Sequence, residues 1–351
     1  MIDRAFWHKR RVLVTGHTGF KGSWLTLWLT GLGAEVCGIA LPPSTHPNLF
    51  DLAKAAEGID HCIQDICNPE ETVAVIRRYA PEIVFHLAAQ PLVRASYRKP
   101  LETLATNIMG TAHLLEALRG LNSVRVAVLI TTDKVYRNLE HPYPYREGDP
   151  LGGHDPYSAS KAAAEIVIAS YRDAFLREQH VAVASARAGN VIGGGDWSED
   201  RLIPDAIRAW QKGEPLHVRR PQAVRPWQHV LDPLFGYLVL AQHLWYYPQD
   251  AGSYNFGPLT HEVATVREVI EQCQCAYGTG KVVWCDGDEG PHEASWLALE
   301  IAKAKSVLGW RPRWSLTEAI ERTIRWYCAL EQGADARKLC EAEIVAYERL
   351  P

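Results

Sequence analysis

Short apolar runs alternate with longer amphipathic stretches through the first half of the chain. The runs at 11–16, 34–41, 59–66, 81–90, 124–136 and 181–193 are apolar and mostly rich in β-branched residues, and they predict strands. Between them, apolar positions at helical spacing predict helices at 22–33, 71–80, 106–119 and 162–176. This order predicts an α/β fold with a doubly wound parallel sheet and helices on both faces.

The regular alternation of strands and helices stops near residue 190. Tryptophan and proline become frequent there, as in RPWQHV and GWRPRW. We therefore expect a sheet domain at 1–189 and a smaller α/β lobe at 190–351. An apolar helical stretch at 231–247 and the GSYNFG segment after it predict that about 228–257 returns to the sheet domain.

The totals exclude several classes of protein. With 351 residues, of which 47% are hydrophobic and 22% charged, the chain has the composition of a packed globular protein. Its net charge of -4 gives no general attraction to nucleic acid or to an anionic membrane, so we expect neither as a partner. The longest apolar stretch contains Asp232, Gln242 and His243 and is too short to span a bilayer.

The eight cysteines follow no metal-binding or disulfide pattern. They lack CxxC pairs and matching histidine spacing, so we predict no metal site. The N-terminal segment shows no apolar signal region with a small-residue cleavage site. We therefore expect reduced cysteines and a cytoplasmic location.

Three glycines follow the first predicted strand. In GHTGFKG, Gly16, Gly19 and Gly22 stand between a strand and a helix. Glycines at this place let the backbone approach a pyrophosphate, and the helix N-terminus offers free N–H groups. The pattern predicts a Rossmann-type dinucleotide site. Its expected lining is Gly16, Thr18, Gly19, Phe20, Lys21, Gly22, Asp65, Ile66, Leu87, Ala88 and Ala89, together with Tyr157 and Lys161.

The end of the second predicted strand bears on the choice between NAD and NADP. An NAD site usually has Asp or Glu there, whereas an NADP site has a nearby Arg. This chain has neither, because Ala40 and Leu41 are followed by two prolines. The lack of a basic residue favours NAD, and the lack of an acid predicts that NAD is held weakly.

Two segments, ITTDKVY and PYSASK, are candidates for a hydride-transfer site. Tyr157 and Lys161 stand four apart, so they share one face of a helix. A nearby ammonium lowers the pKa of a tyrosine, which suits the phenol to take a proton from a sugar hydroxyl. The spacing alone is weak evidence, because Tyr277 and Lys281 repeat it in a glycine-rich turn.

Eight motifs occur in order along the chain: VTGHTGFKG, LAAQ, TTDKVY, YSASK, RAGNVIGGGDW, DRLIPD, RPWQHV and PHEAS. With them the chain resembles the extended short-chain dehydrogenase/reductase family. Within that family it is most similar to the sugar-nucleotide 4,6-dehydratases, and closest to those that act on CDP-glucose. The resemblance extends from about Trp7 to Trp326, which is nearly the whole chain.

The resemblance implies a hydro-lyase that converts CDP-glucose to CDP-4-keto-6-deoxyglucose and water, in deoxysugar synthesis for lipopolysaccharide O-antigen. Tyr157, activated by Lys161 and bonded with Thr132, would take the proton of the sugar 4-hydroxyl while C4 passes hydride to NAD. Asp133 matches the acid that protonates the departing 6-hydroxyl. Hydride then returns to C6, which regenerates NAD.

Lys134 departs from the related TDP-glucose enzymes, which have glutamate at this position. A neutral lysine would be able to remove the C5 proton, which requires a lowered pKa. A cationic lysine would instead stabilise the enolate, while Tyr157 or a water takes the proton. Both roles stay open at the level of the sequence.

The resemblance also implies ligands for the nucleotide sugar, whose diphosphate needs cations or N–H donors. Arg225 is the favoured ligand of the distal phosphate, although Arg219, Arg220 and Arg225 form a basic patch whose members the sequence does not separate. Glu293 joins the implied nucleotide pocket from the PHEA motif. The implied substrate-binding set is Asn190, Arg201, Leu202, Arg219, Arg225 and His292.

Three alternative functions remain. A nucleotide-sugar 4-epimerase would use the same Thr132, Tyr157 and Lys161 but needs no dehydration acid, which Asp133 argues against. Another 4,6-dehydratase, acting on TDP-glucose or GDP-mannose, would carry glutamate in place of Lys134. A nucleotide-sensing protein would have lost the chemistry, which the intact residue set disfavours. The family further implies a homodimer formed through the helices that contain Thr106 and Tyr157.

Overall fold

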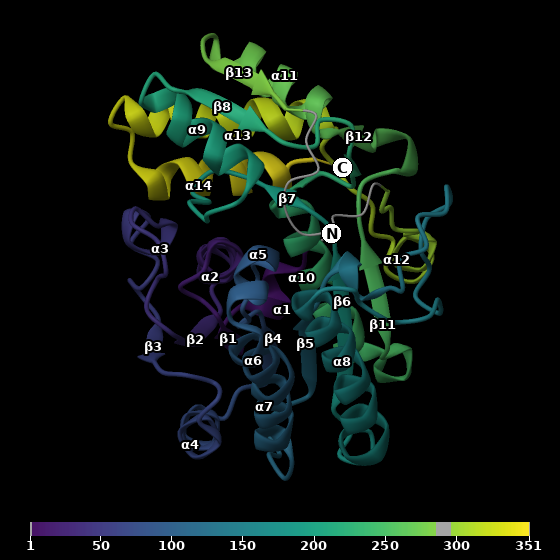
Figure 1. The fold of residues 1–351 in the computed structure, drawn as a ribbon. Helices are drawn as coiled ribbons and strands as arrows, with labels where there is room; N and C mark the ends of the chain where they lie inside the picture. Colours follow the sequence, from purple (N-terminus) through teal and green to yellow (C-terminus); the bar gives the residue numbers. More distant parts are fainter. Residues whose placement is uncertain (1, 286–295, 351) are drawn as a thin grey trace.

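A seven-stranded parallel sheet forms the centre of the molecule (Figure 1). The computed structural model describes residues 2–285 and 296–350. The strands run in the order β11-β6-β5-β4-β1-β2-β3, and each neighbouring pair is parallel. Their bounds are β1 Arg11–Thr15, β2 Glu35–Ala40, β3 Asp60–Ile63, β4 Ile83–His86, β5 Val126–Ile130, β6 Ala182–Ala188 and β11 Ser253–Phe256. The predicted doubly wound parallel sheet is confirmed.

Helices cover both faces of this sheet (Figure 1). Strand β1 shows why, because Val12 and Val14 join one buried core whereas Leu13 joins the other. The first core packs against α2 (Phe20–Gly31) and α10 (Leu231–Tyr246). The second packs against α4 (Pro69–Tyr79), α7 (Gly110–Leu118) and α8 (Pro156–Tyr171). The other helices of this region are α1 Arg4–Trp7, α3 Leu49–Leu52, α5 Val93–Arg98 and α6 Pro100–Leu104.

A smaller lobe is built mainly from residues after 190 (Figure 1). It contains α9 (Leu202–Gln211), α11 (Val266–Tyr277), α13 (Leu316–Glu331) and α14 (Ala336–Glu348). Short strand pairs accompany them: β7 Val191–Ile192 with β10 Gln228–His229, β8 Pro215–Val218 with β13 Lys281–Trp284, and β9 Val224–Arg225 with β12 Ala264–Thr265. Between these pieces the chain returns to the large sheet, since α10 packs on its face and β11 pairs with β6. Helix α12 (Ala302–Leu308) lies against β11.

Three predicted elements start or end in a helical turn of another type. The run at 124–136 is a strand only to Ile130, because Thr132 caps a 3-10 turn at Asp133–Val135. The predicted helix at 106–119 opens with a π-helical turn, Ala105–Met109, and the one at 162–176 closes with another, Arg172–Leu176. The first difference matters for function, because the turn moves the polar residues beyond the edge of the sheet.

The described ranges contain no helix that is long and apolar enough to cross a membrane. Within the same ranges, no group of three or more His, Cys, Asp or Glu residues is arranged to hold a metal ion. All eight cysteines are free thiols.

Candidate active site

A pocket of about 960 Å³ opens where the strands of the large sheet end. Its lining includes residues directly after the carboxyl ends of β1, β2, β4, β5 and β6, namely Gly16, Leu41, Leu87, Thr131 and Gly189. Residues of α9 and β8 in the smaller lobe complete the lining. Ligands of open α/β sheets bind at this edge, in the crevice outside the strand ends.

The glycine turn and the N-terminus of α2 form part of this lining. A Cβ on Gly22 would lie 2.0 Å from the Gly16 carbonyl oxygen, and one on Gly16 would lie 2.7 Å from the Ala88 nitrogen. Both positions therefore require glycine. Gly19 caps α2 without a side-chain hydrogen bond to its first N–H groups, which leaves them available to a pyrophosphate. The turn therefore fits the diphosphate of NAD.

The pocket wall beyond β2 is uncharged. Residues 41–45 line it, and the Thr18 hydroxyl donates a hydrogen bond to the Leu41 carbonyl at 2.8 Å. Asp65 lines the same end of the pocket, where its Oδ1 accepts the Cys67 N–H at 2.8 Å. The remaining predicted cofactor residues also line the pocket: Phe20, Lys21, Ile66, Leu87, Ala88 and Ala89.

Helix α8 brings Tyr157 and Lys161 to the end of β5. The helix starts after Asp155, which accepts the Ser158 N–H and so fixes the first turn. The Lys161 ammonium donates to the Ile130 carbonyl at 3.2 Å. Tyr157 hydrogen-bonds the Thr132 side chain, and the tyrosine is 8% exposed. The predicted threonine, tyrosine and lysine therefore meet at one wall of the pocket.

Burial dominates the ionisation of this pair. It raises the pKa of Tyr157 to about 12, although the bond to Thr132 and the charge of Arg201 act in the opposite direction. Burial also lowers the pKa of Lys161 to about 8, opposed by the charge of Glu165. The predicted lowering of the tyrosine pKa by Lys161 is therefore wrong for this structure, because desolvation outweighs every favourable charge.

The 3-10 turn after β5 holds Asp133 and Lys134. Oδ1 of the buried Asp133 accepts hydrogen bonds from the Thr132 hydroxyl at 2.9 Å and from the Lys134 ammonium at 3.0 Å. Oδ2 has no partner among the described residues, and a Cβ on Gly189 would stand 3.1 Å from it. Lys134 lines the pocket and donates to Asn190 Oδ1 at 3.4 Å. The lysine is thus ion-paired, as a cation would be, while Asp133 is fully buried between two lining residues, Thr132 and Lys134, and keeps one unpartnered oxygen.

A buried ion pair that the sequence did not reveal supports this wall from behind. Glu165 and Arg187 are each 3% exposed and are joined by two hydrogen bonds, of 2.9 and 2.8 Å. Glu165 also accepts from Thr131 at 2.5 Å and from Ser185 at 2.7 Å. Because Thr131 directly precedes Thr132, the pair fixes the strand end that carries the polar turn. Only the position of Glu165 one turn after Lys161 hints at it in the sequence.

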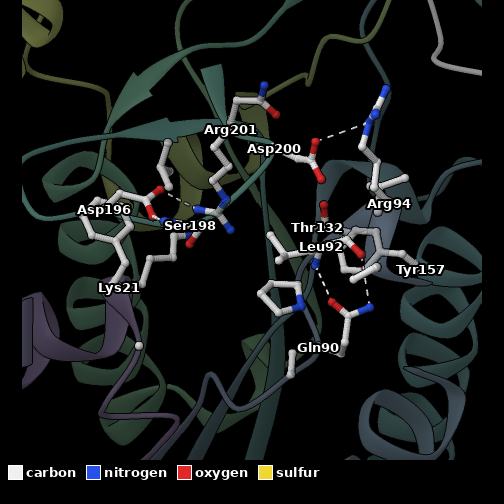
Figure 2. Close-up of a pocket in the computed structure, with 18 of the residues that line it drawn as sticks. Lys21, Gln90, Leu92, Arg94, Thr132, Tyr157, Asp196, Ser198, Asp200 and Arg201 are labelled. Atoms are coloured by element: carbon white, nitrogen blue, oxygen red, sulfur yellow. Dashed lines mark hydrogen bonds and ion pairs between the residues drawn. The ribbon is translucent and has the colours of Figure 1, made fainter. Parts of the chain in front are cut away.

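The smaller lobe contributes Arg201 at the start of α9. Its Nη1 donates to Asp196 Oδ2 at 2.8 Å, and the neighbouring Leu202 lines the pocket. Figure 2 shows Arg201, Asp196 and Ser198 on the same side of the pocket as Lys21. Asp196 belongs to the GGGDW motif, but nothing in the sequence indicated that it would bind Arg201.

Further arginines line the pocket on the lobe side. Arg219 and Arg94 both approach Asp200 Oδ1, at 3.9 and 3.8 Å, and Figure 2 shows the contact to Arg94. Arg225 also lines the pocket, with one Nη1 bond of 2.8 Å to the carbonyl before it. Arg94 and Asp200 were not predicted. Two predicted residues, His292 and Glu293, lie outside the described residues.

Gln90 in the LAAQ motif orders the chain between the cofactor turn and α8. Its side chain donates to Thr103 at 2.8 Å, and its backbone N–H donates to Asn107 at 2.8 Å. Asn107 in turn donates to the Ser160 hydroxyl at 2.8 Å, next to Lys161. These bonds connect the loop after β4 to α8 beside Lys161.

Comparison with known proteins places these features in a family. The family model described as "GDP-mannose 4,6 dehydratase" matches residues 13–323. The chain belongs to this family. A CDP-glucose 4,6-dehydratase of Salmonella typhimurium is 47% identical over 99% of this chain and 98% of that protein. A dTDP-glucose 4,6-dehydratase of Streptomyces antibioticus is 34% identical over 90% of this chain and 92% of that one.

Solved structures with the same fold include sugar-nucleotide epimerases. The UDP-glucose 4-epimerase of Thermus thermophilus in complex with NAD has a TM-score of 0.78 and 26% identity, covering 91% of this chain and 99% of that one. The UDP-glucose 4-epimerase of Thermotoga maritima has a TM-score of 0.79 at 24% identity, covering 92% and 99%. The dehydratase family thus shares its fold with the epimerases, and residues of the site must distinguish the two reactions.

Proposed function

We propose that this protein is a CDP-glucose 4,6-dehydratase, a hydro-lyase that uses NAD and forms CDP-4-keto-6-deoxyglucose and water. The observation that carries the proposal is the 47% identity, over nearly the whole of both chains, to the Salmonella typhimurium enzyme of that name. The dTDP-glucose enzyme at 34% is more distant. The pocket supports the reaction class, because it places a proton-accepting wall beside an acid and a lysine.

Tyr157, Thr132 and Lys161 handle the proton of the sugar 4-hydroxyl. When bound, NAD would accept a hydride from C4 of the sugar and later return it to C6. Tyr157 takes the hydroxyl proton, and Thr132 stabilises the phenolate when its O–H turns from Asp133 Oδ1 to the phenolate oxygen. Lys161 supports the phenolate as a nearby cation while the Ile130 carbonyl fixes its position. The raised pKa of Tyr157 means that this proton transfer needs further positive charge in the pocket.

Asp133 and Lys134 carry the elimination. A water takes the C5 proton and passes it to Asp133 Oδ2, which has no partner in the described chain and gives the proton to the departing 6-hydroxyl. The Lys134 ammonium, ion-paired at 3.0 Å, favours the role of a cation that stabilises the enolate over that of a neutral base. Of the two roles open from the sequence, we therefore propose the cationic one.

Residues at the lobe side of the pocket hold the nucleotide sugar. Arg201, Arg219 and Arg225 supply positive charge for the diphosphate, and all three line the pocket. Asn190 connects this set to Lys134, and Leu202 supplies an apolar contact. We propose this as the substrate wall, with the sheet domain at 1–189 and about 228–257 binding NAD.

A 4-epimerase is the second candidate, because the fold is shared with NAD-bound epimerases. Such an enzyme oxidises and reduces C4 alone and requires no acid for a leaving hydroxyl. The buried Asp133, which keeps one oxygen without a partner in the described chain, argues for dehydration instead.

We also propose that the protein acts as a cytoplasmic homodimer. Leu101 in α6, Met109 in the π-turn and Ile166 in α8 are 79%, 50% and 62% exposed. They lie on packed elements next to one another, and such a patch fits a twofold interface between copies. Light scattering should give twice the chain mass; a monomer mass would refute this proposal. The keto-deoxy product suits deoxysugar synthesis for an O-antigen.

Product analysis tests the proposed function. The protein is incubated with NAD and, separately, with CDP-glucose, TDP-glucose, UDP-glucose and GDP-mannose. We expect a 4-keto-6-deoxy sugar from CDP-glucose. Turnover of TDP-glucose alone would refute the CDP assignment, and a 4-epimer as product would refute dehydration.

A further inference from the structure

Lys21 belongs to the cofactor turn by its backbone, but its side chain leads away from that turn. Its ammonium lies 3.2 Å from the Tyr237 hydroxyl and 5.5 Å from the centre of that ring. Figure 2 shows the side chain extending toward Arg201 and Asp196, on the lobe side of the pocket. The backbone and the side chain of this residue therefore serve different parts of the site.

The positive charges around Lys21 exceed the carboxylates that could neutralise them. No carboxylate in the described chain lies within ion-pair distance of Lys21, whereas Arg201 holds Asp196 through one nitrogen only. Asp133 is committed to Lys134. Two half-buried basic residues, Lys21 and Arg201, thus lie on the same side of the pocket, and only Arg201 has a carboxylate partner, an arrangement that an anionic ligand would complete.

The ionisation of Lys21 agrees with this geometry. Burial lowers its pKa to about 7, and the charges of Arg201 and Lys161 act in the same direction, opposed by Asp133. A phosphate beside the amine would reverse this shift, since an opposite charge favours the ammonium.

We propose that Lys21 and Arg201 together form the subsite for the phosphate that is attached to the sugar of the nucleotide-sugar substrate. This inference rests on the proposed function. Arg201 assigns this subsite to the substrate and not to the cofactor, because Arg201 lines the pocket from the start of α9 in the smaller lobe, whereas the glycine turn follows β1 of the large sheet. The backbone of the glycine turn remains free to bind the diphosphate of NAD. Lys21 then extends over the boundary between the two ligands and joins the substrate wall.

A comparison of CDP with CMP isolates this phosphate. Dissociation constants for CDP-glucose, CDP, CMP and NAD are measured calorimetrically on the wild type and on Lys21→Gln, with NAD saturating in the nucleotide titrations. We expect Lys21→Gln to weaken CDP-glucose and CDP by about ten-fold or more while CMP and NAD change little. Lys21→Arg should restore part of the preference for CDP over CMP. Lys212→Gln, at an exposed lysine after α9, is the matched control and should change nothing.

Proton uptake supplies a second readout. Calorimetric titrations at pH 8 in two buffers of different ionisation enthalpy measure the number of protons taken up on binding. We expect the wild-type protein to take up roughly half a proton or more when it binds CDP. Lys21→Gln should lose that uptake. If Lys21→Gln does not fold, Arg201→Gln tests the other side of the subsite and should also reduce the preference for CDP over CMP.

The outcomes separate this inference from the proposed function. A wild type that prefers TDP-glucose over CDP-glucose would refute the proposed substrate and leave the phosphate subsite to be tested with TDP and TMP. An unchanged ratio of CDP to CMP affinity in Lys21→Gln would overturn the inference. A loss confined to NAD would also overturn it and would assign the side chain to the cofactor.

Discussion

Two charged clusters lie near the pocket wall that holds Thr132, Tyr157 and Lys161, and their charges are paired in different ways. Behind the wall, Glu165 receives hydrogen bonds from Thr131, Ser185 and Arg187, so its charge is fully paired within the chain. In front of it, Arg201 is paired with Asp196, whereas Lys21 has no carboxylate within ion-pair distance in the described chain. The first cluster is part of the fold, whereas the second needs a ligand.

The difference shows how one pocket combines rigidity with affinity for anions. A buried charge that loses its partner costs several kcal/mol, so the Glu165–Arg187 pair holds Thr131, and with it the polar turn, in a fixed position. An incompletely paired cation instead gains its stabilisation from the substrate. Stability and binding are thereby assigned to separate charges.

The largest effect should follow from breaking the paired cluster. We expect Glu165→Gln to lower the free energy of unfolding by about 3–5 kcal/mol, because Arg187 is left buried without a carboxylate. Arg187 pulls the pKa of Glu165 below its usual value despite burial. The difference in free energy of unfolding between the wild type and Glu165→Gln should therefore be largest at neutral pH. It should shrink as the pH falls below the ordinary pKa of a glutamate. Urea unfolding at several pH values measures both.

A surface pair supplies the control for this prediction. Glu116 and Arg119 in and after α7 make two hydrogen bonds, of 2.8 and 2.9 Å, yet both side chains are exposed. Glu116→Gln should cost at most about 1 kcal/mol. An equal decrease in the free energy of unfolding in Glu165→Gln and Glu116→Gln would show that burial does not make the Glu165–Arg187 pair more important for stability.

The second prediction concerns Asp133 and Lys134, which lie between the two clusters. If the Lys134 ammonium stabilises the enolate, Lys134→Ala should still allow C4 oxidation but slow exchange of the C5 proton with solvent by about a hundred-fold. Lys134→Arg, which keeps the cation, should retain much of the exchange rate. Reduced-cofactor absorbance follows the oxidation, and deuterium incorporation follows the exchange.

The arginine variant decides between the two roles of Lys134. A neutral base cannot be replaced by arginine, which stays protonated. Exchange lost equally in Lys134→Ala and Lys134→Arg would therefore favour the neutral base. Exchange unchanged in both would show that the lysine has no role in this step.

What the sequence predicted is mostly what lies close together along the chain. The glycine turn, the alternation of strands and helices and the spacing of Tyr157 and Lys161 are local patterns, because they can be read from short stretches of sequence. The Glu165–Arg187 and Lys21–Arg201 relations join residues that are distant in sequence, so periodicity carries no sign of them. The predicted direction of the Tyr157 pKa shift was wrong because the spacing of two residues reveals a charged neighbour but not how deeply the phenol is buried.

The smallest predicted effect concerns the stability of the incompletely paired cluster. Because the pKa of Lys21 is lowered to about 7 by folding, the folded protein holds fewer protons than the unfolded chain between about pH 7 and the ordinary lysine value of 10.5. The cost of burying this cation is therefore full below pH 7 and disappears as the pH rises toward that value.

Without nucleotide, Lys21→Gln should consequently stabilise the protein, and more at pH 6.5 than at pH 9.5, as measured by thermal unfolding. Adding CDP should reverse the order, because only the wild type then gains a paired ammonium. Lys212→Gln should show no pH-dependent difference from the wild type, since Lys212 is exposed. A Lys21→Gln variant that is less stable than the wild type at both pH values would mean that the amine contributes to the fold through Tyr237, which would remove the contrast with the Glu165 cluster.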